Sequence, residues 1–169
     1  MTDRNEVINQ WLRDAHAMEK QAEKMLTAQA ERLEHYPELR ERIRQHIEET
    51  RSQSDQLSRC LEARGTSASG MKDVLGQMTA MFQGLGGIFA SDEVVKGALA
   101  GYVFEHMEIA SYRILIEAAR SEGDEATAQT CEAICREEEA MAAWLAEHMP
   151  EVTRTYLSRE AAELEEAKR

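Results

Sequence analysis

The sequence has 169 residues, of which 43% are apolar, so its length and composition fit one domain of ordinary size. Aromatic residues make up only 5% and there are just two prolines, which argues against a β-sandwich or barrel, because such folds need aromatic and β-branched strands separated by frequent turns. The formal net charge of −12 argues against nucleic acid or an anionic membrane as a partner.

The N-terminus and the cysteines indicate a compartment. Residues 1–6 are polar and of mixed charge, unlike the basic and then apolar start of a secretory signal. The three cysteines, Cys60, Cys131 and Cys135, are an odd number without the close pairs of a metal finger, which is typical of a reducing cytosol. No run approaches the roughly twenty apolar residues of a membrane span. We therefore expect a cytoplasmic protein without a membrane partner.

Two long helices are predicted in the first part of the chain. Apolar residues recur with a period near 3.6 over residues 4–34 and again over 38–64. Pro37 ends the first helix and suits the first turn of the second, and Gly65 suits the C-terminal cap of the second. Because the joint between them is only a few residues long, we expect an antiparallel hairpin.

A long link follows. Residues 66–90 are too many for a hairpin loop, and their Met-rich stretch, about 71–83, predicts a short crossover helix. A third long helix is predicted over 91–121, with Ser91 or Asp92 as its N-cap.

The fourth long helix is predicted over 124–149. Asp124 is suited to cap its N-terminus, and Pro150 is expected to end it. The charged tail beyond, about 153–168, predicts a separate final helix. The short joint before Asp124 makes the third and fourth helices a second antiparallel hairpin.

The connection lengths predict the topology. Each long helix should extend about 40 Å, and the long link can cover that distance and join two parallel helices. Two hairpins with one long crossover form an all-α, ferritin-like antiparallel four-helix bundle, here a single domain over residues 1–169 with an extra C-terminal helix. The alternative is four helices joined by an unstructured link.

Several carboxylates stand where the helical period calls for an inward-facing residue. In the first, third and fourth helices, glutamates fill gaps in the apolar series, and a histidine with a neighbouring glutamate lies along the inward face of the second. These residues are Glu19, His46, Glu49, Glu105, Glu108 and Glu138.

The spacing of these residues suggests one shared site. Glu19 and Glu49 are 30 residues apart, as are Glu108 and Glu138, and each pair crosses one hairpin joint, so all four can lie at matching depths. Burying several carboxylates together is prohibitive unless cations or protons neutralise them. Oxygen-rich ligand sets with an imidazole suit iron or manganese, so we expect a dinuclear centre of one of these metals.

Two other interpretations of these residues remain open. A shift of a residue or two in the helix boundaries would turn the glutamates onto a solvated surface. Alternatively, they could be buried but paired with arginines and bind no metal, the available partners being Arg13, Arg44 and Arg113.

At these residues the sequence resembles the YciE/YciF family of ferritin-like bacterial proteins. The resemblance covers about residues 5–148 and is most specific in the second and third helices. It rests on Ala-Met-Glu-Lys-Gln at 17–21, His-Ile-Glu-Glu-Thr at 46–50 with Gln53, Glu-His-Met-Glu-Ile-Ala-Ser-Tyr at 105–112, Glu137-Glu138 before Leu145, and Gly70-Met71 at the start of the crossover helix.

The resemblance implies a ferritin-like bundle, commonly a homodimer, associated with bacterial stress responses. The wider ferritin and rubrerythrin group holds two metals with a Glu on helices one and three and an E-x-x-H pair on helices two and four, and four glutamates here match. The histidines of those pairs are replaced by Ser52 and Met141. The resemblance therefore leaves His46 as the expected nitrogen donor and Glu108 as an extra carboxylate.

Together these observations predict a stress-response protein with a dinuclear iron or manganese centre that reacts with peroxide or oxygen. Tyr102 and Tyr112 lie on the same helix as two of the expected ligands and could influence that chemistry. The competing hypothesis is a metal-free, dimeric helical-bundle scaffold without catalysis, whose inward carboxylates are protonated or paired with arginines.

Overall fold

The computed structural model describes residues 4–68 and 93–162, which form four long helices and, within these residues, no strand. The helices are α1 (Arg4–Arg32), α2 (Pro37–Ala63), α4 (Glu93–Ser121) and α5 (Glu125–Ala161). The crossover helix predicted at 71–83 and the N-caps predicted at Ser91 or Asp92 lie outside the described residues.

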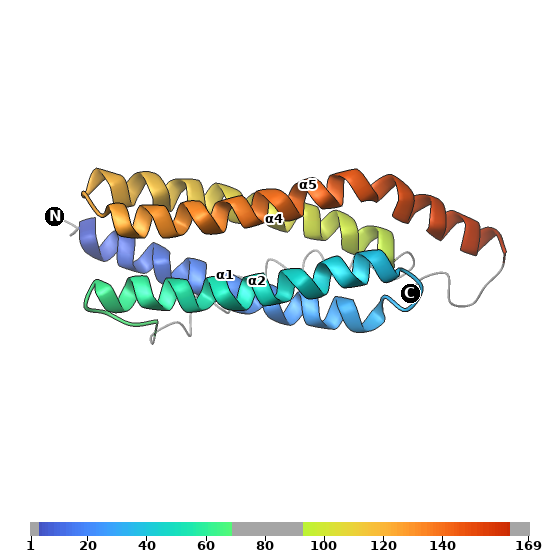
Figure 1. Ribbon diagram of the computed structural model, residues 1–169, viewed down its shortest axis with the longest axis horizontal. Helices are drawn as coiled ribbons and strands as arrows, with labels where there is room; N and C mark the ends of the chain where they lie inside the picture. Colours follow the sequence, from blue (N-terminus) through green and yellow to red (C-terminus); the bar gives the residue numbers. More distant parts are fainter. Residues whose placement is uncertain (1–3, 69–92, 163–169) are drawn as a thin grey trace.

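The helices form two antiparallel hairpins that pack lengthwise against each other (Figure 1). α1 pairs with α2 and α4 with α5, and the hairpins meet through α1 on α4 and α2 on α5. In Figure 1, α2 and α4 run in the same direction, so the link joins two parallel helices, as predicted. The ferritin-like four-helix topology is therefore confirmed.

The local signals at the helix ends act as the sequence predicts. Pro37 is the first residue of α2, and Gly65 lies in the left-handed region with φ 74° just after that helix. Gly123 has φ 75° in the joint between α4 and α5. Asp124 caps α5, because its carboxylate accepts a hydrogen bond of 3.1 Å from the Thr127 amide.

The prediction that the fourth helix ends before Pro150 was wrong. α5 runs through Pro150 to Ala161, so the predicted separate tail helix at 153–168 is its continuation as far as the described residues reach. The proline leaves the carbonyl of Ala146 without its usual amide donor. The continuing helix buries Val152 against the core and packs Tyr156 on it, which offsets that loss.

One arginine links three helices at one end of the bundle. Arg64, just after α2, donates to Asp124 at 2.5 Å and to Asn9 of α1 at 2.6 Å. These bonds fix the position of α2 along the bundle axis relative to α1 and α5. This position determines which side chains of the different helices meet in the core.

The core is apolar at both ends of the bundle and polar in its middle. Buried Leu, Ile and Ala side chains fill most of it, including Leu12, Leu57, Ile134 and Leu145. Between them lie side chains that almost never lose contact with water unless they have partners. Those at 1% exposure or less with an ionisable group are His46, Glu19, Glu105, Glu108 and Glu138. Among the described residues, no helix is long and apolar enough to cross a membrane.

Candidate metal centre

His46 is the centre of the polar core. It lies on α2 and is 1% exposed. Its Nε2 atom is 3.2 Å from Glu105 Oε2 and 3.3 Å from Glu138 Oε2, and its Nδ1 atom is 2.7 Å from Glu49 Oε2. One imidazole therefore contacts carboxylates from α2, α4 and α5.

Four of the six predicted ligands meet at one point. His46, Glu105, Glu108 and Glu138 each offer one ligand atom, and these atoms lie within 4.8 Å of one another. Glu105 and Glu108 share a face of α4 because they are one helical turn apart. We call these four residues the ligand cluster. Its members are all buried, so the interpretation that places them on a solvated surface is wrong.

Glu19 lies next to the ligand cluster but is not one of its four members. It is 1% exposed on α1, and its Oε1 atom accepts a hydrogen bond from the hydroxyl of Tyr112, which is fully buried on α4. The negative charges of Glu138 and Glu105 act on it, which shows that it faces the same interior. The structure thus brings a further carboxyl group to the site from α1, the helix that has no member in the ligand cluster.

Glu49 has a different environment from the other glutamates. Its side chain is 21% exposed, and besides His46 it accepts hydrogen bonds from Arg42 at 3.2 Å and Gln45 at 2.9 Å. Burial raises the pKa of Glu49, but the hydrogen bond from His46 and the positive charge of Arg42 outweigh it and lower that pKa to about 2. Glu49 is therefore ionised and holds the His46 ring in place, with Nε2 turned to the ligand cluster.

The buried carboxyl groups are poorly satisfied by the protein itself. Within the described residues, five carboxylate oxygen atoms are buried and have no regular hydrogen-bond partner: Glu19 Oε2, Glu105 Oε2, Glu108 Oε1 and both Oε atoms of Glu138. Two of them, Glu105 Oε2 and Glu138 Oε2, contact the same Nε2 atom of His46, at 3.2 and 3.3 Å. Buried polar atoms are nearly always hydrogen-bonded in proteins. Five such oxygens around one imidazole therefore indicate a site that is completed by a group other than a side chain.

Burial and mutual repulsion make these groups hard to ionise. Burial, followed by the charge of a neighbouring carboxylate, raises the pKa of Glu19 and of Glu108 well above the ordinary value of 4.5. Burial raises the pKa of Glu105 to about 8 despite its hydrogen bond with His46. Burial lowers the pKa of His46, but its hydrogen bonds to Glu105, Glu138 and Glu49 outweigh this and raise it well above 6.5. In the metal-free protein, protons therefore take the place of cations.

The arginines proposed as partners of these carboxylates are engaged elsewhere or exposed. Arg13 pairs with Glu6 at 3.0 Å, Arg113 pairs with Glu139 at 2.7 Å, and Arg44 is exposed. Over residues 4–68 and 93–162, no arginine or lysine forms an ion pair with the ligand cluster or with Glu19. Pairing with arginine is therefore not how these charges are balanced.

The sequence did not reveal the roles of two residues that hydrogen-bond to the glutamates of the site. Tyr112 lies four residues after Glu108, so helical spacing places it on the same face, but the spacing cannot show that its hydroxyl reaches Glu19. Arg42 lies one turn before His46, and the sequence alone does not distinguish it from an ordinary surface arginine. The structure shows that it forms an ion pair with Glu49. His106, by contrast, is exposed and hydrogen-bonds through Nδ1 to the Tyr102 carbonyl.

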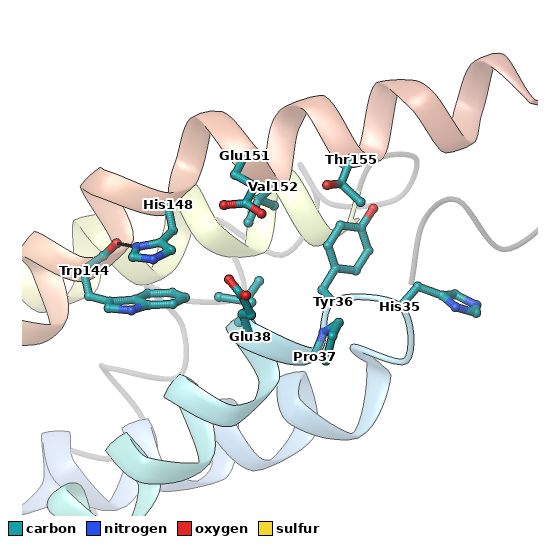
Figure 2. Close-up of a pocket in the computed structure, with 10 residues that line it drawn as sticks. His35, Tyr36, Pro37, Glu38, Trp144, His148, Glu151, Val152 and Thr155 are labelled. Atoms are coloured by element: carbon teal, nitrogen blue, oxygen red, sulfur yellow. Dashed lines mark hydrogen bonds between the residues drawn. The ribbon is translucent and has the colours of Figure 1, made fainter.

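A separate cavity of about 170 Å³ lies where the α1–α2 joint meets α5 (Figure 2). The Trp144 and His148 rings stack in it with centroids 3.9 Å apart, and Glu38 and Glu151 face each other across it. None of the predicted ligands lines this cavity. The polar core and this surface hollow are thus separate features.

Comparison with known proteins agrees with this fold. The family model described as "Domain of unknown function (DUF892)" matches residues 3–158. A crystal structure of a protein from Xanthomonas campestris is 45% identical, with a TM-score of 0.79, and the match covers 94% of this chain and 99% of that one.

Two further solved structures share the fold at lower identity. The Escherichia coli stress protein YciF is 23% identical over 88% of this chain and 96% of its own, with a TM-score of 0.78. YcfI from Rhodopseudomonas palustris is 24% identical over 86% of this chain and 94% of its own, with a TM-score of 0.73. The predicted resemblance to YciF-like proteins is thereby confirmed in the fold, and the chain belongs to the DUF892 family.

Proposed function

We propose that this protein binds a dinuclear iron or manganese centre in its polar core. The observation that carries the proposal is the buried cluster of His46 with Glu105, Glu108 and Glu138, whose ligand atoms lie within 4.8 Å of one another and include carboxylate oxygens without a regular hydrogen-bond partner. Carboxylate oxygens with an imidazole nitrogen are donors that suit both metals.

The charge in the core supports two ions rather than one. Glu19, Glu105, Glu108 and Glu138 are buried and together carry four negative charges when ionised. Two divalent cations balance that charge with His46 neutral. The ligand cluster would hold one ion, and Glu19 with the remaining oxygens of Glu108 and Glu138 would contribute to the second.

The surrounding residues have roles that follow from their contacts. With Nδ1 of His46 bound to Glu49, the imidazole presents Nε2 to the metal, which is the carboxylate–histidine–metal arrangement common in metalloproteins. Tyr112 fixes the orientation of the Glu19 carboxylate through its hydroxyl. The residues predicted as six ligands would thus act as five ligands and one orienting group, Glu49.

Iron or manganese would supply one-electron chemistry toward oxygen or peroxide, and on this basis we propose a protective role under stress. The three thiols are free and buried, which fits a reducing cytoplasm. Burial of the whole site would keep reactive products away from bulk water.

Metal analysis of protein purified without chelator tests the proposal. We expect about two equivalents of iron or manganese per chain, loss of metal in Glu138→Gln, and full retention in the matched control Glu139→Gln, whose side chain is exposed. Glu138→Gln keeps the shape of the side chain and removes its charge. A metal-free wild type whose melting temperature is unchanged by added Mn²⁺ or Fe²⁺ would reject the metal centre.

The metal-free scaffold remains the alternative, and one observation favours it. A pKa of about 8 for Glu105 means that protons alone can neutralise part of the core near neutral pH. Metal analysis separates the two functions directly, since a scaffold needs no metal for stability.

We also propose that the protein is a homodimer. α4 carries three exposed apolar side chains on its outer face, Leu99, Val103 and Ile114, each more than half exposed. Side chains of this kind on one face are typical of subunit contacts. Sedimentation equilibrium of the wild type and of Val103→Arg tests this: we expect a dimer that the arginine weakens, and a monomeric wild type would refute it.

A further inference from the structure

A groove separate from the metal ligands lies between α1 and α4, which run side by side in opposite directions (Figure 1). Its volume is about 300 Å³, at the lower end of the range for small-molecule sites. Most of its lining is apolar, including Ala22, Leu26, Val94 and Phe104. It extends along α4 from Glu93 to Glu105, a rise of about 18 Å. The groove is therefore long and narrow.

The inner end of the groove reaches the polar core. Glu105, a member of the ligand cluster, forms part of the lining, and its buried Oε2 atom lies 3.2 Å from Nε2 of His46. Glu105 as a whole is 1% exposed. A molecule that fills the groove would thus end beside the ligand cluster.

The outer end of the groove is charged. Arg32 of α1 donates to Glu93 of α4 at 2.6 Å, and both side chains line the groove. The guanidinium has five N–H donors, and its fork geometry matches carboxylates. Arg32 is 55% exposed, so donors not bonded to Glu93 can receive a second carboxylate from outside.

Small residues on α4 keep the groove open. Gly97, Ala100 and Gly101 line it on one side. A Cβ atom at Gly101 would come no closer than 3.5 Å to Leu145, so no close backbone contact requires glycine there. At Gly97, by contrast, a Cβ atom would come within 2.9 Å of Gln29 Nε2, so the Gln29 side chain occupies part of the groove there and the opening lies beside Ala100 and Gly101.

We propose that the α1–α4 groove binds an unbranched aliphatic monocarboxylate, with its carboxylate at Arg32 and its tail directed at Glu105. The length, narrow shape and apolar lining fit an extended alkyl chain. The reverse orientation would place a second negative charge against the carboxyl groups of the polar core. The binding step does not require the metal, but a reaction at the tail rests on the proposed metal centre.

Titration of metal-free protein with decanoate, followed by calorimetry, tests the groove by itself. We expect saturable binding of one decanoate per chain, weakened about tenfold or more in Ala100→Phe, because the ring takes the place of the chain. The control Ala140→Phe adds the same ring at an exposed position of α5 and should bind as the wild type does. Absence of saturable binding, or equal binding by Ala100→Phe, would overturn the proposal.

A second variant guards against a folding defect in Ala100→Phe. Arg32→Gln changes an exposed residue and should weaken decanoate binding while leaving decanol binding unchanged, because decanol lacks the carboxylate. Equal loss of both ligands, or loss of neither, would contradict the assigned orientation. If the wild type excludes decanoate and Ala100→Phe instead dissociates a dimer, the groove is a subunit contact and the proposal is wrong.

Loading with Mn²⁺ separates failure of the groove from failure of the metal centre. In the loaded protein, paramagnetic broadening of bound decanoate should be strongest at the terminal methyl group and weakest at the methylene beside the carboxylate. Strongest broadening at the carboxylate end would overturn the orientation. If the protein takes up no Mn²⁺ but still binds decanoate, the groove stands and the metal centre fails.

Discussion

A single substitution in the ligand cluster should separate the stability of the protein from its function. Glu108 is 1% exposed, its Oε1 atom has no hydrogen-bond partner, and burial with neighbouring carboxylates raises its pKa well above 4.5. Glu108→Met replaces it with an apolar side chain of similar length. This change removes the repulsion between Glu108 and the neighbouring carboxylates, while the contacts of His46 with Glu105 and Glu138 stay in place.

The size of the effect follows from the unsatisfied oxygen. Leaving a buried polar atom without a partner costs about 1–3 kcal/mol, so metal-free Glu108→Met should be more stable than the metal-free wild type by about that amount. For a chain of this length, that is a rise in melting temperature of about 2–12 °C. The gain should grow with pH, since a buried carboxyl with a raised pKa opposes folding more strongly once it must ionise.

The assay is urea unfolding in the presence of EDTA, repeated with added Mn²⁺. Bound metal at a hundred times its dissociation constant stabilises a protein by about 2.7 kcal/mol, so the wild type should gain stability from Mn²⁺ and Glu108→Met should gain far less. Glu117→Met, at an exposed position of α4, is the control and should change stability by less than about 0.5 kcal/mol. A metal-free Glu108→Met that is less stable than the wild type would refute the reasoning that these carboxylates are unsatisfied.

Three further predictions follow from the same contacts. Metal-free protein should lose stability as pH rises from about 5 to about 8, because Glu105, with a pKa of about 8, and His46 hold protons in the folded state that the unfolded chain releases at lower pH. Urea unfolding that shows stability rising over this pH range would contradict this. Tyr112→Phe should destabilise the protein by about 1–3 kcal/mol, because it leaves a buried Glu19 oxygen without its donor, and an unchanged urea midpoint would argue against that bond. Pro150→Ala should stabilise the protein by about 2 kcal/mol, because the restored hydrogen bond within α5 outweighs the higher conformational entropy of the unfolded chain. A lower melting temperature of this variant would show that proline is favoured at position 150.

Helical periodicity predicted which faces point inward. The apolar series in α1, α4 and α5 predicted that Glu19, Glu105 and Glu138 face the core, and all three are buried. This works because the sequence encodes the face of a helix directly, through residues three and four apart. The sequence encodes the position of each helix along the bundle axis less directly. Short joints such as Gly123-Asp124 nevertheless leave little freedom for one helix to slide along the next.

The limits of the prediction lie in contacts between helices and in the effect of proline. Nothing in the spacing distinguishes Glu49, which orients His46, from Glu138, which meets its Nε2 atom, because both face the interior side of their helices. The helix end predicted before Pro150 was wrong because the prediction considered the local cost of a proline but not the burial of Val152 two residues later. The error at Pro150 thus concerns packing against the core, which the local sequence around the proline does not contain.

The position of His46 explains why one imidazole can serve this core. A histidine one turn before a glutamate on the same helix hydrogen-bonds that glutamate through Nδ1, as His46 does with Glu49, and this fixes the ring so that only Nε2 faces the bundle interior. The core then has one nitrogen and up to eight oxygens from Glu19, Glu105, Glu108 and Glu138 as donors. Such a set favours hard, oxygen-preferring cations more strongly than a set with two imidazoles does. Manganese is therefore as good a candidate as iron for this member of the fold.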